Sequence, residues 1–125
     1  GLAAAKAYYL SEGDPGGRVA EIDTALALSR TGYANNQNAD GGEGYRSSGY
    51  NSSYQQTASA IWAAMVGGAD VNDATLQGFL NWEYQNYNYE TIWAAYNSWR
   101  QSYYYYMWSS SKAYNLIQDA GIPAA

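Results

Sequence analysis

The sequence predicts an all-α protein built from antiparallel helical hairpins, in a single domain over residues 1–125. Alanine-rich segments alternate with loops of glycine, asparagine and serine, and apolar residues recur within these segments at helical spacing. No stretch shows the strict alternation that is typical of a half-buried strand. Since leucine, isoleucine and valine are scarce, the 15 tyrosines and 5 tryptophans are expected to supply much of the buried surface.

The first two predicted helices form a hairpin around a Gly/Pro turn. Residues 2–13 form an alanine-rich helix that ends at Gly13, and Pro15 follows as a stop signal. The second helix covers residues 18–32, and its apolar stripe consists of Val19, Ile22, Leu26 and Tyr33. Residues 34–53 are too rich in Gly and Asn for a regular element, so they predict a long loop.

The next two helices are predicted over residues 53–66 and from Asn72 onward. The first of them ends at Gly67 and Gly68, and its apolar stripe consists of Tyr54, Ala58, Ile61 and Met65. Asn72 is expected to cap the following helix, with Asp73 in the first turn. That helix carries on one face Leu76, Phe79, Leu80 and Tyr84.

The C-terminal part is predicted to hold a short helix around residues 91–96 and a final helix over residues 102–120. The first, third and final long helices close on Gly13, Gly67 and Gly121, which lie 54 residues apart in both intervals. Equal spacing indicates an internal repeat, so the chain corresponds to two and a half helical hairpins.

Three segments carry a family resemblance. QNADGGEGY at 37–45 is followed by SYQQTASAIWAAMVGGAD at 53–70, and SYYYYMWSSSKAYNLI stands at 102–117. This pattern resembles the repeat of the prenyltransferase and squalene-cyclase superfamily, in the form of its secreted bacterial members. The resemblance implies an α/α-toroid, a ring of six hairpins around a cavity. At about 50 residues per hairpin, closure takes roughly 300 residues, so the chain is expected to be a fragment or a subunit of a larger array.

The composition excludes several function classes. Without histidine or cysteine there is no thiolate zinc site, thiol nucleophile or Ser-His triad. Within the superfamily that the chain resembles, the absence of histidine and cysteine excludes the zinc-dependent and the thioester members. The acidic motif of the cyclases also has no equivalent in this sequence. The net charge of −5 disfavours nucleic acid, and no apolar run is long enough to span a bilayer. We therefore expect no catalytic activity and no cofactor.

Two pairs of acidic residues are the remaining candidates for acid–base chemistry. Asp40 and Glu43 share the glycine-rich loop, and Asp70 and Asp73 lie near a helix start. Paired carboxylates serve glycosidases and lyases. Turn formation for the first pair and helix capping for the second are the favoured interpretations.

The glycine-rich loop also resembles a calcium-binding loop. Oxygen-bearing side chains alternate along it, which makes Asn36, Asn38, Asp40 and Glu43 candidate calcium ligands. The twelfth position is Ser47 instead of a bidentate glutamate. The favoured alternative is a turn in which Gln37 ties helix ends together.

The run of four tyrosines before Met107 is the most unusual feature. Four successive side chains on a helix point in all directions, so they cannot all face one core. We expect an interface between copies to include Tyr103, Tyr104, Tyr105, Tyr106, Trp108, Trp93, Tyr96, Trp99, Tyr8 and Tyr9. Contact with a sugar or another ligand, and a redox or cross-linking role, are the alternatives.

These observations predict a non-catalytic structural protein, secreted or at the cell surface, that self-associates through aromatic helical faces. The expected partner is a further copy of the chain, in a homo-oligomer or a filament. A binding module for carbohydrate or an apolar ligand, with a Tyr/Trp-lined concavity, is the alternative. An enzyme that acts like a terpene cyclase or on polysaccharides ranks third.

Overall fold

A computed structural model describes residues 1–46, 49–86 and 99–121 of the chain. The described part is all-helical, as predicted, and its only β-type pairing is an isolated bridge between Gln37 and Glu43. The helices are α1 (Leu2–Ser11), α2 (Arg18–Asn36), α3 (Tyr54–Val66), α4 (Ala74–Asn86) and α5 (Trp99–Asp119). None of them is long and apolar enough to cross a membrane.

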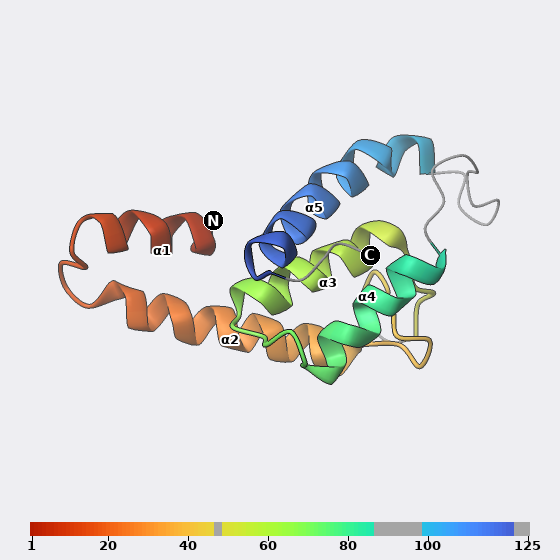
Figure 1. The fold of residues 1–125 in the computed structure, drawn as a ribbon, viewed down its shortest axis with the longest axis horizontal. Coiled ribbons are helices and arrows are strands. Elements are labelled where there is room, and N and C mark those ends of the chain that lie inside the picture. The colour runs from red at the N-terminus through yellow and green to blue at the C-terminus, as the bar shows by residue number, and fades with distance from the viewer. Residues whose placement is uncertain (47–48, 87–98, 122–125) are drawn as a thin grey trace.

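The helix α1 and the first half of α2 form an antiparallel hairpin that projects from the rest of the chain (Figure 1). We call this hairpin the arm. The turn between its helices uses left-handed backbone at Gly13, Asp14, Gly16 and Gly17. An ion pair of 2.6 Å between Lys6 and Asp23 joins the two helices. The arm therefore has a defined shape, although α1 buries none of its residues.

The helix α3 is the centre of the remaining structure, which we call the body. It packs against α2, α4 and α5, and seven of its residues are buried. Small side chains let the neighbouring helices approach closely, because Ala60 on α3 and Ala113 on α5 are both 0% exposed. The core consists of Ala60, Ile61, Ala64, Leu76, Phe79, Ala113 and Ile117.

The observed helix ends refine the predicted ones. The helix α2 continues past Gly32 to Asn36, so the predicted end at residue 32 is wrong. Asp73, and not Asn72, caps α4, because its carboxylate accepts a 3.0 Å hydrogen bond from the Leu76 N–H. The Asn72 N–H instead donates to Asp70 at 2.8 Å. The short helix predicted over residues 91–96 lies outside the described residues.

Three helices are each followed by a left-handed glycine, but the equal spacing that predicted an internal repeat is not kept. The glycines that follow α1, α3 and α5 in left-handed conformation are Gly13, Gly68 and Gly121. Gly67, expected in this role, has a φ of −81° and is itself the C-cap of α3. The packing of these helices differs, since α5 packs along α3 whereas α1 packs against α2. A toroidal arrangement of hairpins stays a prediction.

Candidate functional sites

Asp40 organises the loop between α2 and α3. Its Oδ1 accepts hydrogen bonds from the Gly42 N–H at 3.0 Å and the Ser52 hydroxyl at 2.7 Å. Its Oδ2 accepts the Trp82 indole N–H at 3.0 Å, which ties the loop to α4. Partial burial alone would raise the pKa of Asp40, but the hydrogen bonds from Ser52, Gly42 and Trp82 outweigh it and lower this pKa. Asp40 is therefore a carboxylate at neutral pH.

Two further amide side chains fix the same loop. The Asn38 side-chain NH₂ donates at 2.8 Å to both the Tyr50 carbonyl and the Ser52 hydroxyl. The Gln37 NH₂ donates at 2.9 Å to the carbonyls of Gly41 and Thr75. Gln37 thus joins the end of α2 to the start of α4, which confirms the turn interpretation of this loop.

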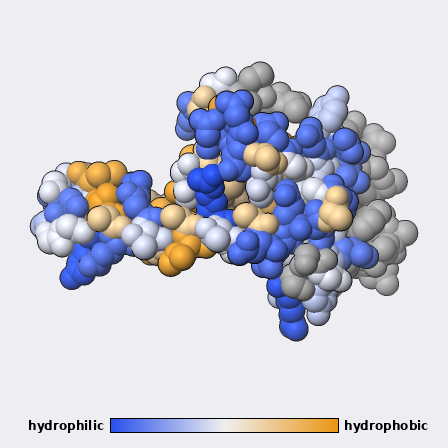
Figure 2. Space-filling view, turned by 90° about the horizontal axis from the view of Figure 1, so that it is seen from below, coloured by the Kyte–Doolittle hydropathy of each residue, from blue (hydrophilic) through white to orange (hydrophobic). Residues whose placement is uncertain are grey.

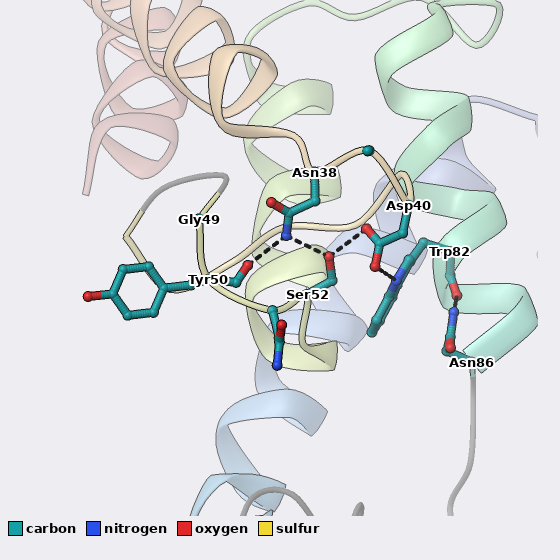
Figure 3. A pocket seen from close by; sticks show the side chains of 9 residues that line it. Asn38, Asp40, Gly49, Tyr50, Ser52, Trp82 and Asn86 are labelled. Carbon is teal, nitrogen blue, oxygen red and sulfur yellow. Dashed lines mark hydrogen bonds between the residues drawn. The ribbon is translucent and has the colours of Figure 1, made fainter.

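A cleft of about 400 Å³ opens beside the Asp40 network. It is lined by residues 38–40 and 49–52 of the loop and by Trp82 and Asn86 of α4. Figure 3 shows Asn38, Ser52 and Asp40 side by side between Tyr50 and Trp82. Among the described residues, the lining contains one carboxylate and no basic residue. Sequence analysis did not find this cleft, because its two walls come from segments about forty residues apart.

The four candidate calcium ligands have different surroundings. Both oxygens of Asp40 already accept hydrogen bonds. The Asn38 NH₂ donates within the loop, whereas its buried Oδ1 has no hydrogen-bond partner among the described residues. Asn36 is the last residue of α2, and Glu43 is 3% exposed. Across residues 1–46, 49–86 and 99–121, no three acidic side chains are grouped closely enough to hold a metal ion. Calcium binding stays a prediction.

Two glutamates are buried in the body. Burial raises the pKa of Glu43 to about 7 and that of Glu83 to about 9. Neither carboxyl oxygen of Glu83 has a hydrogen-bond partner within the described residues, and the nearby Ala58 N–H only partly opposes the effect of burial. The burial of Glu83 was not predicted from the sequence. Glu83 follows Leu76 by seven residues and Phe79 by four, and this helical spacing places it on the apolar stripe of α4.

The second acidic pair has structural roles. Asp73 caps α4 and forms an ion pair with Arg30 of α2. Asp70 accepts hydrogen bonds from the backbone and side chain of Asn72 and so shapes the turn before α4. These contacts agree with the capping interpretation of Asp70 and Asp73.

The aromatic residues of α5 divide between its exposed and buried sides. Tyr104 is 81% exposed and Trp108 is 59% exposed, and Tyr103 and Tyr105 are also exposed. Tyr106, which was expected at an interface, is 4% exposed and packs in the body against Tyr54. Successive side chains on a helix point in different directions, and Tyr106 is the tyrosine of this run that points toward α3 and α4. There it packs in a buried cluster with Tyr54, Ala58 and Trp82.

The remaining predicted interface residues lie on the arm or near the start of α5. Tyr8 is 60% exposed, Tyr9 is half-buried, and their rings meet edge to face with centroids 5.6 Å apart. Trp93 and Tyr96 lie outside the described residues. Trp99 is the first residue of α5, and its side chain is not described.

A cation–π contact marks the exposed face of α5 next to α3. The Lys112 ammonium lies 2.8 Å from the ring centroid of Trp108 and 5.0 Å from that of Trp62. A lysine held between two tryptophans fixes the Trp108 ring on this surface. The exposed residues Tyr103, Tyr104, Tyr105, Met107 and Trp108 are called the aromatic face of α5 below.

Comparison with protein-family models, curated proteins and solved structures gives no match for this chain. Function therefore has to be argued from its own side chains. The features available are the exposed arm, the aromatic face of α5 and the cleft beside Asp40.

Proposed function

We propose that this chain is a non-catalytic structural module that self-associates through α1 and the aromatic face of α5. The observation that carries the proposal is the exposure of α1, which buries no residue in the described structure. Leu2, Tyr8 and Leu10 are 45%, 60% and 57% exposed. Covering these side chains is favourable by roughly 25 cal/mol per Å² of apolar surface, and the described part of the chain leaves them exposed.

The aromatic face of α5 supplies a second apolar surface. Tyrosine, tryptophan and methionine are enriched at protein interfaces, and tryptophan and tyrosine dominate the residues that contribute most to binding. Tyr104 is the most exposed of the described aromatic residues, and the Lys112 ammonium contacts the Trp108 ring. A partner that binds here meets rings that lose little side-chain freedom.

The two surfaces belong to different helices in different parts of the molecule (Figure 1). A contact between α1 of one copy and α5 of the next is heterologous, so it leaves one free surface at each end. Such contacts extend into a filament unless the rotation between copies closes a ring. The proposal includes a secreted or cell-surface setting, which the low content of charged residues, 14%, supports as a matter of composition.

Mixing two complementary variants tests this proposal. The first carries Tyr8→Ser and Leu10→Ser on α1, and the second carries Tyr104→Ser and Trp108→Ser on α5. Each variant alone should remain monomeric, because it lacks one of the two surfaces. Their mixture should form a 1:1 dimer and nothing larger, measured by light scattering after size exclusion.

The matched control carries Tyr45→Ser and Tyr84→Ser, two tyrosines that are each 69% exposed and lie on neither surface. It should assemble as the unmodified chain does. A mixture that stays monomeric, or single variants that assemble normally, contradicts the proposed contact.

A further inference from the structure

The cleft beside Asp40 has the size and construction of a small-molecule site. Its volume of about 400 Å³ falls within the usual range for ligand pockets. Its polar groups are held in place before any ligand arrives, since Asp40, Ser52 and Asn38 are joined in one hydrogen-bonded chain (Figure 3). Preorganised groups lower the entropic cost of binding.

The charge of the cleft selects against anions. Asp40 is ionised at neutral pH, and none of the described residues that line the cleft is a lysine or arginine that could neutralise a phosphate, sulfate or carboxylate ligand. A metal ion is also a poor fit, because both Asp40 oxygens already accept hydrogen bonds and the lining contributed by described residues holds no second carboxylate.

The remaining polar groups suit a ligand with many hydroxyls. Asn51 brings a side-chain amide to the lining, and an amide both donates and accepts hydrogen bonds. Asn86 offers its amide oxygen, because its NH₂ donates to the Trp82 carbonyl at 2.8 Å. Hydroxyl groups can match both functions, and a neutral sugar presents several of them close together. The polar lining gives no comparable match to an apolar ligand.

Aromatic side chains flank these polar groups. Trp82 is 7% exposed and forms a wall, whereas the Tyr50 ring is 48% exposed and remains accessible. An accessible tyrosine ring offers an apolar surface for the C–H face of a sugar, with a hydroxyl at its edge. Figure 3 shows the Tyr50 ring on the opposite side of Asn38 and Ser52 from Trp82.

We propose that this cleft binds a neutral carbohydrate, with Tyr50 as the stacking ring and Asn51 and Asn86 as hydrogen-bonding groups. The site is separate from α1 and from the aromatic face of α5. Sugar binding therefore neither requires self-association nor follows from it. On an assembled structural protein, such a site would attach each copy to a glycan.

Calorimetric titration with defined sugars tests the proposal. The probes are maltotetraose, cellotetraose, mannotetraose and N-acetylchitotetraose, with tetragalacturonate as an acidic sugar of the same length. At least one neutral sugar should bind saturably with a Kd of about 1 mM or tighter. Tetragalacturonate should bind at least about tenfold more weakly, because its carboxylates meet Asp40 without a compensating cation.

Two substitutions of exposed lining residues should weaken this binding without unfolding the chain. Tyr50→Ala and Asn51→Ala should each raise Kd by about fivefold or more, while Tyr45→Ala, an exposed tyrosine of the same loop that does not line the cleft, should leave Kd unchanged. The proposal is overturned if no neutral probe binds up to about 5 mM. Equal binding of tetragalacturonate, or binding that survives both substitutions, overturns it as well.

Discussion

The helices α1 and α3 are both rich in alanine and similar in length, yet one buries nothing and the other buries seven residues. In the body, α3 is surrounded by three helices, and its apolar side chains form the core. In the arm, α1 packs against α2, and its leucines and Tyr8 are exposed. Figure 2 shows apolar atoms gathered on the arm, whereas the visible face of the body is mainly hydrophilic.

This difference separates side chains that stabilise the fold from those that remain free for a partner. An isolated helix of ten residues is marginal in water, so α1 depends on its hairpin with α2. Core residues of the body should control the free energy of unfolding. Exposed residues of the arm should control association instead.

The largest effect is expected when the same kind of truncation is made in the two regions. Phe79→Ala removes a ring that is 0% exposed in the body and should cost about 3–5 kcal/mol of unfolding free energy. Leu10→Ala removes a side chain that is 57% exposed on the arm and should cost less than about 0.5 kcal/mol. Urea denaturation of dilute samples measures both. Equal losses would mean that arm and body do not differ as described.

The next effect concerns pH and is confined to the body. Burial raises the pKa of Glu83 to about 9 from 4.5, so the folded chain keeps a proton that the unfolded chain releases. The stability from Glu83 is fully present below a pH of about 4.5 and is lost as the pH rises toward 9, at up to about 1.4 kcal/mol per unit. The pKa of Glu43 is raised to about 7, so the stability from Glu43 is also lost as the pH rises from about 4.5 to about 7.

Glu83→Gln keeps the size of the side chain and removes its ionisation, so it should raise the free energy of unfolding at pH 8 by about 1–3 kcal/mol. The loss of stability between pH 7 and 9 should also become flatter. Glu12→Gln on the exposed turn of the arm is the control and should change stability at pH 8 by less than about 0.5 kcal/mol. Denaturation series at pH 6, 7, 8 and 9 give these slopes, and an unchanged slope in Glu83→Gln contradicts the assignment.

A smaller effect is expected at two glycines with different surroundings. A Cβ at Gly42 would lie 2.6 Å from the Ser52 Cβ and 2.8 Å from the Trp82 ring, so Gly42→Ala should cost about 1–3 kcal/mol. A Cβ at Gly32 on α2 meets no atom within 4 Å, so Gly32→Ala should stabilise the helix by up to about 1 kcal/mol. Thermal unfolding midpoints should move in opposite directions. A lower midpoint for both variants would show that Gly32 is also packed.

The sequence pattern predicts where the helices lie, but not which side chains they pack against. Helical periodicity predicted the burial of Leu76 and Phe79 on α4 correctly. Tyr84, predicted on the same face, is 69% exposed, and Trp82 and Glu83 are buried in its place. Asn72 and Asp73 are both good capping residues. The hydrogen bond from the Leu76 N–H to the Asp73 carboxylate shows that Asp73 has this role. Tyr104 and Tyr106 are identical in type, and tertiary packing alone decides that Tyr106 is buried.

The candidate sites were predicted less completely, since they depend on contacts between distant segments. Asp40 was recognised as a loop residue, but its bond to Trp82 joins residues that lie far apart in the sequence. Local patterns do not encode such a contact, so the cleft between the loop and α4 was not foreseen. The burial of Glu83 was foreseeable from its position on the apolar stripe of α4.

Sedimentation velocity of the unmodified chain, from about 1 µM to about 200 µM, tests self-association most directly. Exposed apolar surfaces on α1 and α5 predict a weight-average sedimentation coefficient that rises with concentration, with species beyond the dimer at the upper end. The same series on the double variant of α5, Tyr104→Ser with Trp108→Ser, should show no such rise. A single monomeric species for the unmodified chain at every concentration would contradict the proposed function.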